Sequence, residues 1–287
     1  MARKLRFPEL LALTALWAGC PRDDGVQDGQ DGSNSPPPVQ GEWYRPNMNT
    51  TWQWQLQPDA TGRINTSYAA DVYDVDLFEA PPTLIEELHA LNRRVICYFS
   101  AGTFENFRPD AGGFEPAELG RRLADFADER WLDIRSDNVY RIMLARLDLA
   151  VQKHCDCVEP DNVDGYANDN GFGFTAADQL EFNRFIANAA HARGLCVGLK
   201  NDLDQVPQLV AYFDFSVNEQ CHEFGECDGL LPFIAAGKPV FNAEYAGRYV
   251  ADPVQRAALC AAAQGLGLRT LVLPLALDDA FRFSCEP

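Results

Sequence analysis

The residues at 157–166, Cys-Val-Glu-Pro-Asp-Asn-Val-Asp-Gly-Tyr, place three carboxylates within six positions: Glu159, Asp161 and Asp164. The residues just before them read as a short buried strand, and Asp-Gly predicts a turn. Because an ionised carboxylate is costly to bury without partners, acidic residues at the end of a strand are not expected to belong to the hydrophobic core. Two interpretations remain open, a turn-forming and helix-capping cluster or a set of acids for acid–base chemistry.

The elements that must position these acids alternate along the chain. Strands are predicted at 51–57, 71–78, 94–100, 156–161, 195–199, 213–217, 239–243 and 269–274. Helices are predicted at 83–91, 139–150, after 175, and at 206–212, 230–236 and 253–265, with capping boxes from Thr83 with Glu86 and from Thr175 with Asp178. Residues 102–130 read as an irregular insertion, followed by a short strand at 131–134. This alternation predicts an α/β protein, a single-domain (β/α)8 TIM-like barrel. A doubly wound open sheet is the alternative, but no Gly-x-Gly-x-x-Gly follows any strand.

Polar residues stand where nearly every predicted strand ends. Parallel strands of a barrel bring these ends to one face, so the side chains are expected to share a site, although each alone could be a structural cap. They are Asp74, Asp76, Ser100, Glu159, Asp161, Lys200, Asn201, Asn218, Glu219, Glu244 and Tyr245.

The motifs of several enzyme classes are missing. The chain has no Gly-x-Ser-x-Gly elbow, no Walker loop and no His-Glu-x-x-His, and it has only four histidines. No metal or cofactor is therefore expected. A pair of acids beside Trp54, Tyr98 and Tyr166 suits a sugar-binding cleft, because aromatic rings stack on sugars and the acids supply acid–base or nucleophilic groups. Core packing is the alternative role for these aromatic residues.

Several motifs in one order resemble the endo-α-1,4-polygalactosaminidases of glycoside hydrolase family 114. They are Tyr98-Phe-Ser-Ala-Gly102, Glu-Pro-Asp-Asn-Val-Asp-Gly-Tyr at 159–166, Lys200-Asn201, Asn218-Glu219-Gln220-Cys221 and Glu244-Tyr245, and the similarity covers about residues 50–280. The resemblance implies a TIM-like barrel that cleaves α-1,4-linked galactosamine polymers.

The resemblance also implies roles for single residues. Asp161 and Glu219 would be the catalytic carboxylates. Substrate-binding or cleft-shaping residues would be Asp74, Tyr98, Glu159, Asp164, Tyr166, Lys200, Asn218, Glu244 and Tyr245. We predict Glu219 as the general acid, with a pKa raised by neighbouring carboxylates, and Asp161 as the nucleophile or base.

The N-terminus predicts export. Residues 1–20 read as a signal peptide with a lipoprotein-like end, which makes Cys20 a candidate lipidation site. Residues 21–41 read as a disordered linker, and the barrel is expected at 42–287. The eight other cysteines predict up to four disulfides; Cys221–Cys227 is the expected local bridge, and the other pairings stay open. The protein is expected outside the cell or on its outer surface.

The formal charge of −18 becomes −20 once residues 1–19, with a net charge of +2, are removed. Such a chain repels nucleic acid and attracts cations, so the expected partner is a cationic amino-sugar polymer, bound by a monomer. Two alternatives stay open. One is a non-catalytic surface lipoprotein that binds this polymer. The other is a calcium-stabilised barrel with Asp161, Asp164 and Asp169 as ligands.

Overall fold

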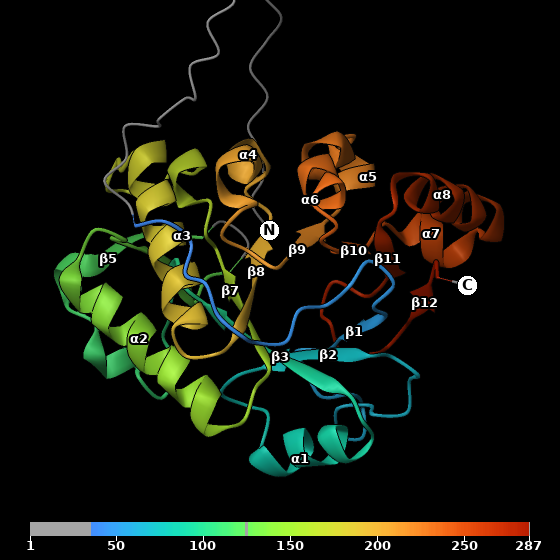
Figure 1. The fold of residues 1–287 in the computed structure, drawn as a ribbon, viewed down its shortest axis with the longest axis horizontal. Coiled ribbons are helices and arrows are strands. Elements are labelled where there is room, and N and C mark those ends of the chain that lie inside the picture. The colour runs from blue at the N-terminus through green and yellow to red at the C-terminus, as the bar shows by residue number, and fades with distance from the viewer. Residues whose placement is uncertain (1–35, 124–125, 287) are drawn as a thin grey trace, which may run out of the picture.

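The computed structural model describes residues 36–123 and 126–286 (Figure 1). The predicted signal peptide, Cys20 and residues 21–35 of the predicted linker lie outside the described residues. The main sheet has nine strands in the spatial order β1-β2-β3-β7-β8-β9-β10-β11-β12. Their bounds are β1 Trp52–Trp54, β2 Val72–Asp76, β3 Arg94–Ser100, β7 Cys157–Asp161, β8 Cys196–Lys200, β9 Phe215–Glu219, β10 Val240–Glu244, β11 Arg269–Val272 and β12 Phe283–Ser284.

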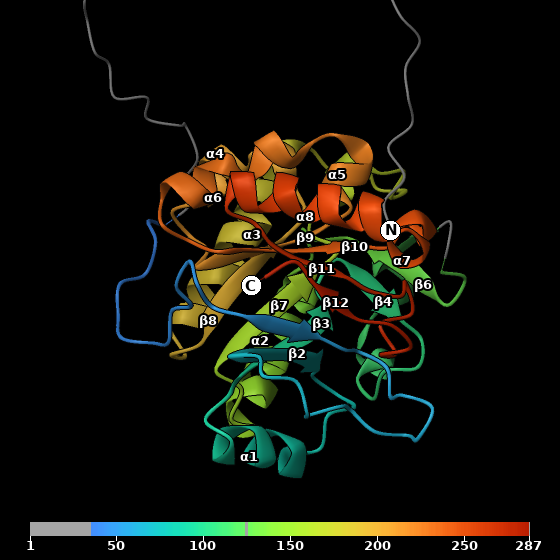
Figure 2. The same cartoon turned by 90° about the vertical axis from the view of Figure 1, so that its right-hand side faces the viewer.

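Neighbouring strands from β1 to β11 pair in parallel, and only β12 pairs antiparallel, with β11. The predicted α/β class is confirmed, and the sheet is curled with its helices outside (Figures 1 and 2). The helices are α1 Pro82–Ala90, α2 Asp137–Gln152, α3 Ala176–His191, α4 Val206–Leu209, α5 Cys221–Phe224, α6 Leu231–Ala235, α7 Gly247–Ala251 and α8 Pro253–Leu266. Among the described residues, no backbone ladder joins β1 to β11, and no helix separates β1 from β2.

Two helix starts test the predicted capping boxes. At α3, the hydroxyl of Thr175 accepts from the backbone N–H of Asp178, and the Asp178 carboxylate accepts in return, so this box is confirmed. At α1, the predicted box of Thr83 and Glu86 is wrong. The N-cap is Pro81, which makes no side-chain cap, and Pro82 opens the helix. Proline tolerates this position because the first helical N–H groups have no partner within the helix.

The insertion between β3 and β7 is more regular than the sequence predicts. It holds a three-stranded antiparallel sheet in the order β4-β6-β5, with β4 at Thr103–Glu105, β5 at Leu119–Arg122 and β6 at Glu129–Leu132. The predicted strand at 131–134 corresponds to β6. The pairing partners were not evident because each strand has only three or four residues, too few for a periodic pattern.

Four disulfides join the cysteines outside the N-terminal segment: Cys97–Cys155, Cys157–Cys196, Cys221–Cys227 and Cys260–Cys285. The predicted local bridge between Cys221 and Cys227 is confirmed. Cys97–Cys155 and Cys157–Cys196 tie β3 and β8 to the segment that carries the acidic motif. In the part of the chain that the structure describes, no helix is both long and apolar enough to cross a membrane.

Candidate active site

A cleft of about 1230 Å³ opens over the carboxyl ends of the parallel strands, beside the insertion. Of the catalytic and substrate-binding residues that the resemblance implies, four line it: Tyr98, Asp161, Lys200 and Glu219. They come from β3, β7, β8 and β9, which are neighbours in the sheet. The parallel register thus brings side chains from distant parts of the sequence to one place, as the strand-end pattern predicts.

The Lys200 side chain is the centre of this group, and it is only 3% exposed. Its Nζ atom lies 3.0 Å from Oδ1 of Asp161, 3.2 Å from Oε2 of Glu219 and 3.7 Å from Oε1 of Glu159. The same ammonium group stands 5.1 Å from the centre of the Trp54 ring. Burial alone would lower the pKa of Lys200, but the three carboxylates raise it well above its usual value. Lys200 is therefore a fixed positive charge between the acids.

Asp161 has a second partner on its other oxygen. The Tyr98 hydroxyl donates to Oδ2 at 3.0 Å, and the backbone N–H of Asn162 donates to Oδ1 at 2.7 Å. Burial would raise the pKa of Asp161, but Lys200 and the hydrogen bond from the Asn162 N–H lower it, and the net shift is downward. The carboxylate is therefore ionised and held in one orientation, as a nucleophile or a base requires.

Glu219 is also held from both sides. The Tyr245 hydroxyl donates to its Oε1 at 2.7 Å, and the Asn201 amide donates to Oε2 at 3.4 Å. Burial acts to raise the pKa of Glu219, but Lys200 lowers it, and the net shift is downward. The raised pKa predicted for a general acid is therefore wrong for Glu219 in this structure. Neighbouring acids do oppose ionisation, but the lysine between them has the larger effect.

Four of the predicted site residues lie beneath the cleft with no exposed surface: Asp74, Glu159, Asn218 and Glu244. Burial, and next the Glu159 charge, raise the pKa of Asp74 well above its usual value. Burial also raises the pKa of Glu159 to about 7, although Lys200 opposes it. Two adjacent buried carboxyl groups of this kind favour a shared proton over two charges. In this conformation these side chains support the cleft residues from below and do not touch its solvent.

Two further predicted residues lie to one side. Tyr166 borders a separate hollow of about 300 Å³ together with Arg121 and Asn168. The pKa of Asp164 is raised to about 6, by burial first and then by the charge of Asp161. Neither residue lines the main cleft, so the structure brings the acidic motif only partly into it.

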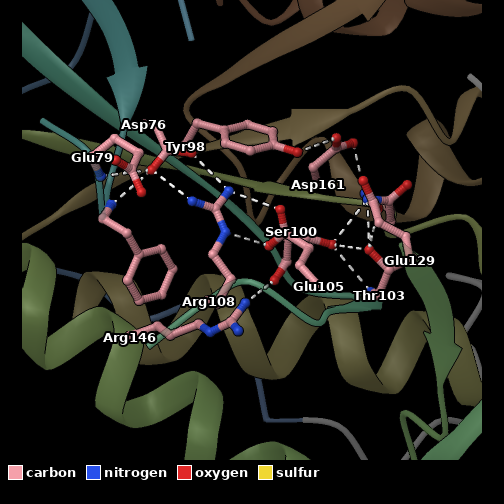
Figure 3. Close-up of polar contacts among 12 residues, drawn as sticks. Asp76, Glu79, Tyr98, Ser100, Thr103, Glu105, Arg108, Glu129, Arg146 and Asp161 are labelled. Atoms are coloured by element: carbon pink, nitrogen blue, oxygen red, sulfur yellow. Dashed lines mark hydrogen bonds and ion pairs between the residues drawn. The ribbon is translucent and has the colours of Figure 1, made fainter. Parts of the chain in front are cut away.

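The insertion contributes charged residues that the strand-end pattern missed (Figure 3). Arg108 donates to both oxygens of Asp76, at 2.9 and 2.7 Å, and to both oxygens of Glu105, at 2.8 Å each. Glu129 lines the same cleft and accepts from the Thr103 hydroxyl at 2.9 Å. Only the pairing of β4 with β6 reveals that these residues face the site, because they belong to no motif.

The described residues offer little for a metal ion. The one group in the described ranges that is close enough to hold an ion, Cys221, His222 and Cys227, contains two disulfide-bonded cysteines, which present no thiolates. The calcium alternative also finds no support among them. Asp161 is bound by Lys200 and Tyr98, whereas Asp169 forms an ion pair with Arg121 and its side chain is 70% exposed.

Comparisons with known proteins identify the family and the fold. The sequence model of glycoside-hydrolase family GH114 matches residues 33–286. The crystal structure of Aspergillus fumigatus Ega3 in complex with galactosamine is 41% identical, with a TM-score of 0.79, over 88% of this chain and 100% of that one. The glycoside hydrolase domain of PelA from Pseudomonas aeruginosa shares the fold at 15% identity and a TM-score of 0.58, over 80% and 96% of the two chains. Trehalulose synthase MutB from Pseudomonas mesoacidophila shares it at 8% identity and a TM-score of 0.58, over 78% and 64%. A search of curated proteins finds no match.

Proposed function

The chain belongs to glycoside-hydrolase family GH114, and from this premise we propose that it cleaves α-1,4-linked galactosamine-containing polysaccharide with Asp161 and Glu219. That it is a glycoside hydrolase follows from the family and from the similarity to Ega3, and it confirms the resemblance found in the sequence. One observation carries the assignment of the pair: two ionised carboxylates face each other across Lys200 at the wall of a large cleft.

The substrate proposal rests on charge and on the relative at 41% identity, whose structure holds galactosamine. Free galactosamine units are cationic near neutral pH, and the chain has a formal charge of −18. Such a surface attracts a cationic polymer, more strongly at low salt. An exported protein would meet this polymer outside the cell, and four disulfides are typical of exported proteins. A lipid anchor at Cys20 remains part of this proposal.

We propose a retaining mechanism, with which the short distances of both carboxylates from Lys200 are compatible. Lys200 Nζ is 3.0 Å from one carboxylate and 3.2 Å from the other, so the two oxygens concerned lie at most about 6 Å apart. Retaining glycosidases hold their carboxyl groups about 5–5.5 Å apart, and inverting enzymes hold them roughly 6.5–9.5 Å apart. Asp161 would attack the anomeric carbon while Glu219 protonates the departing glycosidic oxygen. Glu219 would then take a proton from the water that releases the sugar from Asp161.

A closed barrel is the form in which we propose that this site operates. At the seam, the Trp52 indole N–H donates to the Arg269 carbonyl at 2.9 Å, and Arg269 Nε donates to the Thr50 carbonyl at 3.3 Å. The Leu56 and Gln57 N–H groups both donate to the Leu277 carbonyl at 3.1 Å. These contacts support closure of the eight parallel strands into the predicted (β/α)8 barrel.

Release of reducing ends from partly deacetylated α-1,4-galactosaminogalactan tests the function. Wild type should release them, and Glu219→Gln should not, with an unchanged circular dichroism spectrum and melting temperature. Equal release by both proteins would remove Glu219 from the chemistry. If wild type binds the polymer but releases nothing, the non-catalytic binding protein is the better description.

A further inference from the structure

We propose that Glu129 is a specificity-determining residue that binds the ammonium group of an amino-sugar unit of the substrate. This inference rests on the proposed function and deepens it, because it assigns the preference for a free amine over an N-acetyl group to one side chain. Glu129 lies in β6 of the insertion, outside every motif of the acidic strands, and it lines the same cleft as Asp161 and Glu219.

A negative charge at the position of Glu129 destabilises the fold. It is the direct cross-strand partner of Glu105 in the pairing of β4 with β6. Like charges directly opposite each other in an antiparallel pair are destabilising. Arg108 relieves the charge of Glu105 through two hydrogen bonds of 2.8 Å, and it also binds both oxygens of Asp76. The guanidinium group is thus committed to the two other acids.

Among the described residues, Glu129 has no such cationic partner. Within residues 36–123 and 126–286, no lysine, arginine or histidine forms an ion pair with it. The one side-chain hydrogen bond that it makes with the described residues comes from Thr103, whose hydroxyl lies 2.5 Å from that of Ser100 and 3.2 Å from the Asn162 amide (Figure 3). Burial, and next the charge of Glu105, raise the pKa of Glu129 to about 7. The carboxyl group is therefore oriented by the protein but has no cation beside it, and an ammonium group bound there would lower its pKa and favour the ionised form.

A structural role would not need this charge. A glutamine at 129 could accept the same hydrogen bond from Thr103, and it would remove the repulsion from Glu105. A carboxylate that is oriented, half-buried and open to a substrate cleft matches an ammonium group, which has donors only and carries the missing positive charge. N-acetylation removes that charge, so an acetylated unit cannot compensate Glu129.

Steady-state kinetics of Glu129→Gln test the inference with two substrates, fully deacetylated α-1,4-galactosamine oligosaccharides and the same oligosaccharides after chemical re-N-acetylation to about half of their amines. We expect KM for the deacetylated substrate to rise roughly tenfold or more, the loss that a charge-assisted hydrogen bond predicts, while kcat stays within about threefold. KM for the re-acetylated substrate should change much less, so the preference for free amines should fall.

Asp128→Asn is the matched control, because it removes the same charge from the neighbouring exposed residue, which also borders the cleft. We expect it to change KM less than about twofold. An equal rise in KM for both variants would mean attraction by net charge and would overturn the assignment to Glu129. An unchanged KM in Glu129→Gln would overturn it as well.

The test separates this inference from the proposed function. If wild type does not cleave either oligosaccharide, the proposed function fails; if wild type cleaves and the variant keeps its preference, only the Glu129 assignment fails. Folding is checked by the melting temperature, which should stay the same or rise in Glu129→Gln because the repulsion from Glu105 is removed. A lower melting temperature together with parallel losses of kcat for both substrates would show a structural role and contradict the proposal.

Discussion

The Lys200 ammonium nitrogen lies 3.0 Å from Oδ1 of Asp161, and the same nitrogen lies 3.2 Å from Oε2 of Glu219. One buried cation therefore holds both carboxylates ionised and at a defined distance from each other. The arrangement favours a nucleophile, which must be charged, and it opposes a general acid, which must carry a proton. Activity should therefore be greatest on the acid side of neutrality, where some Glu219 is protonated while Asp161 is ionised.

Asp161→Asn should lower kcat by three orders of magnitude or more, because an amide cannot attack the anomeric carbon or act as a base. Reducing-end release measures the loss. Asp169→Asn is the control from the same segment, since the Asp169 side chain is 70% exposed and forms its ion pair with Arg121, outside the main cleft. It should keep wild-type activity. If Asp161→Asn stayed near wild type, Glu159 would become the candidate.

Lys200→Met should move the pH profile of kcat/KM to higher pH. Lys200 lowers the pKa of Asp161 and of Glu219, so its removal raises both values and shifts both limbs of the profile upward. Lys238→Met is the control, since this lysine donates to the carbonyl oxygens of Val210 and Phe213, away from the cleft. A profile that keeps its position in Lys200→Met would contradict the role of the lysine.

Asp202→Asn should stabilise the protein, and the gain should grow with pH. Burial is the main cause that raises the pKa of Asp202 to about 9, and one of its oxygens, Oδ1, has no hydrogen-bond partner. Below pH 4 the folded and unfolded states both hold this proton. Between pH 4 and pH 9 the unfolded state releases it and the folded state does not, so stability falls as pH rises.

Thermal unfolding at pH 4, 6 and 8 measures this effect. The gain of Asp202→Asn should be small at pH 4 and reach on the order of 5 kcal/mol at pH 8. Asparagine also tolerates the left-handed backbone at this position, where φ is 48°. Asp204→Asn, a change at a neighbouring exposed acid, should change the free energy of unfolding little at any of these pH values. A gain independent of pH would point to the backbone and not to the proton.

Arg108→Met should destabilise the fold by about 3–5 kcal/mol, because it leaves Asp76 and Glu105 buried without their cation. Arg135→Met breaks an ion pair with Asp133 in which the arginine is 44% exposed, and it should cost under about 1 kcal/mol. Denaturant unfolding of both variants gives the comparison. Similar losses in the free energy of unfolding would mean that the Arg108 network stabilises the fold no more than a surface ion pair does.

The sequence by itself determined the α/β class, the order of the elements and the family. Buried parallel strands such as 94–100 are apolar along their length, and helices such as α3 carry their own caps, so local patterns suffice for them. The polar residues after the strands also predicted that Asp161, Lys200 and Glu219 lie together, because the ends of parallel strands meet at one face.

Only the tertiary structure decided which neighbouring charge has the larger effect on the pKa of each acidic residue. Proximity to Lys200 lowers the pKa of Glu219, although the sequence shows only its acidic neighbours. The pairing of β4 with β6 likewise places Glu129 opposite Glu105 and beside the cleft, which strands of three or four residues do not encode locally. Burial and cross-strand contacts depend on residues that are distant from one another in the sequence. They exist only once the chain has folded.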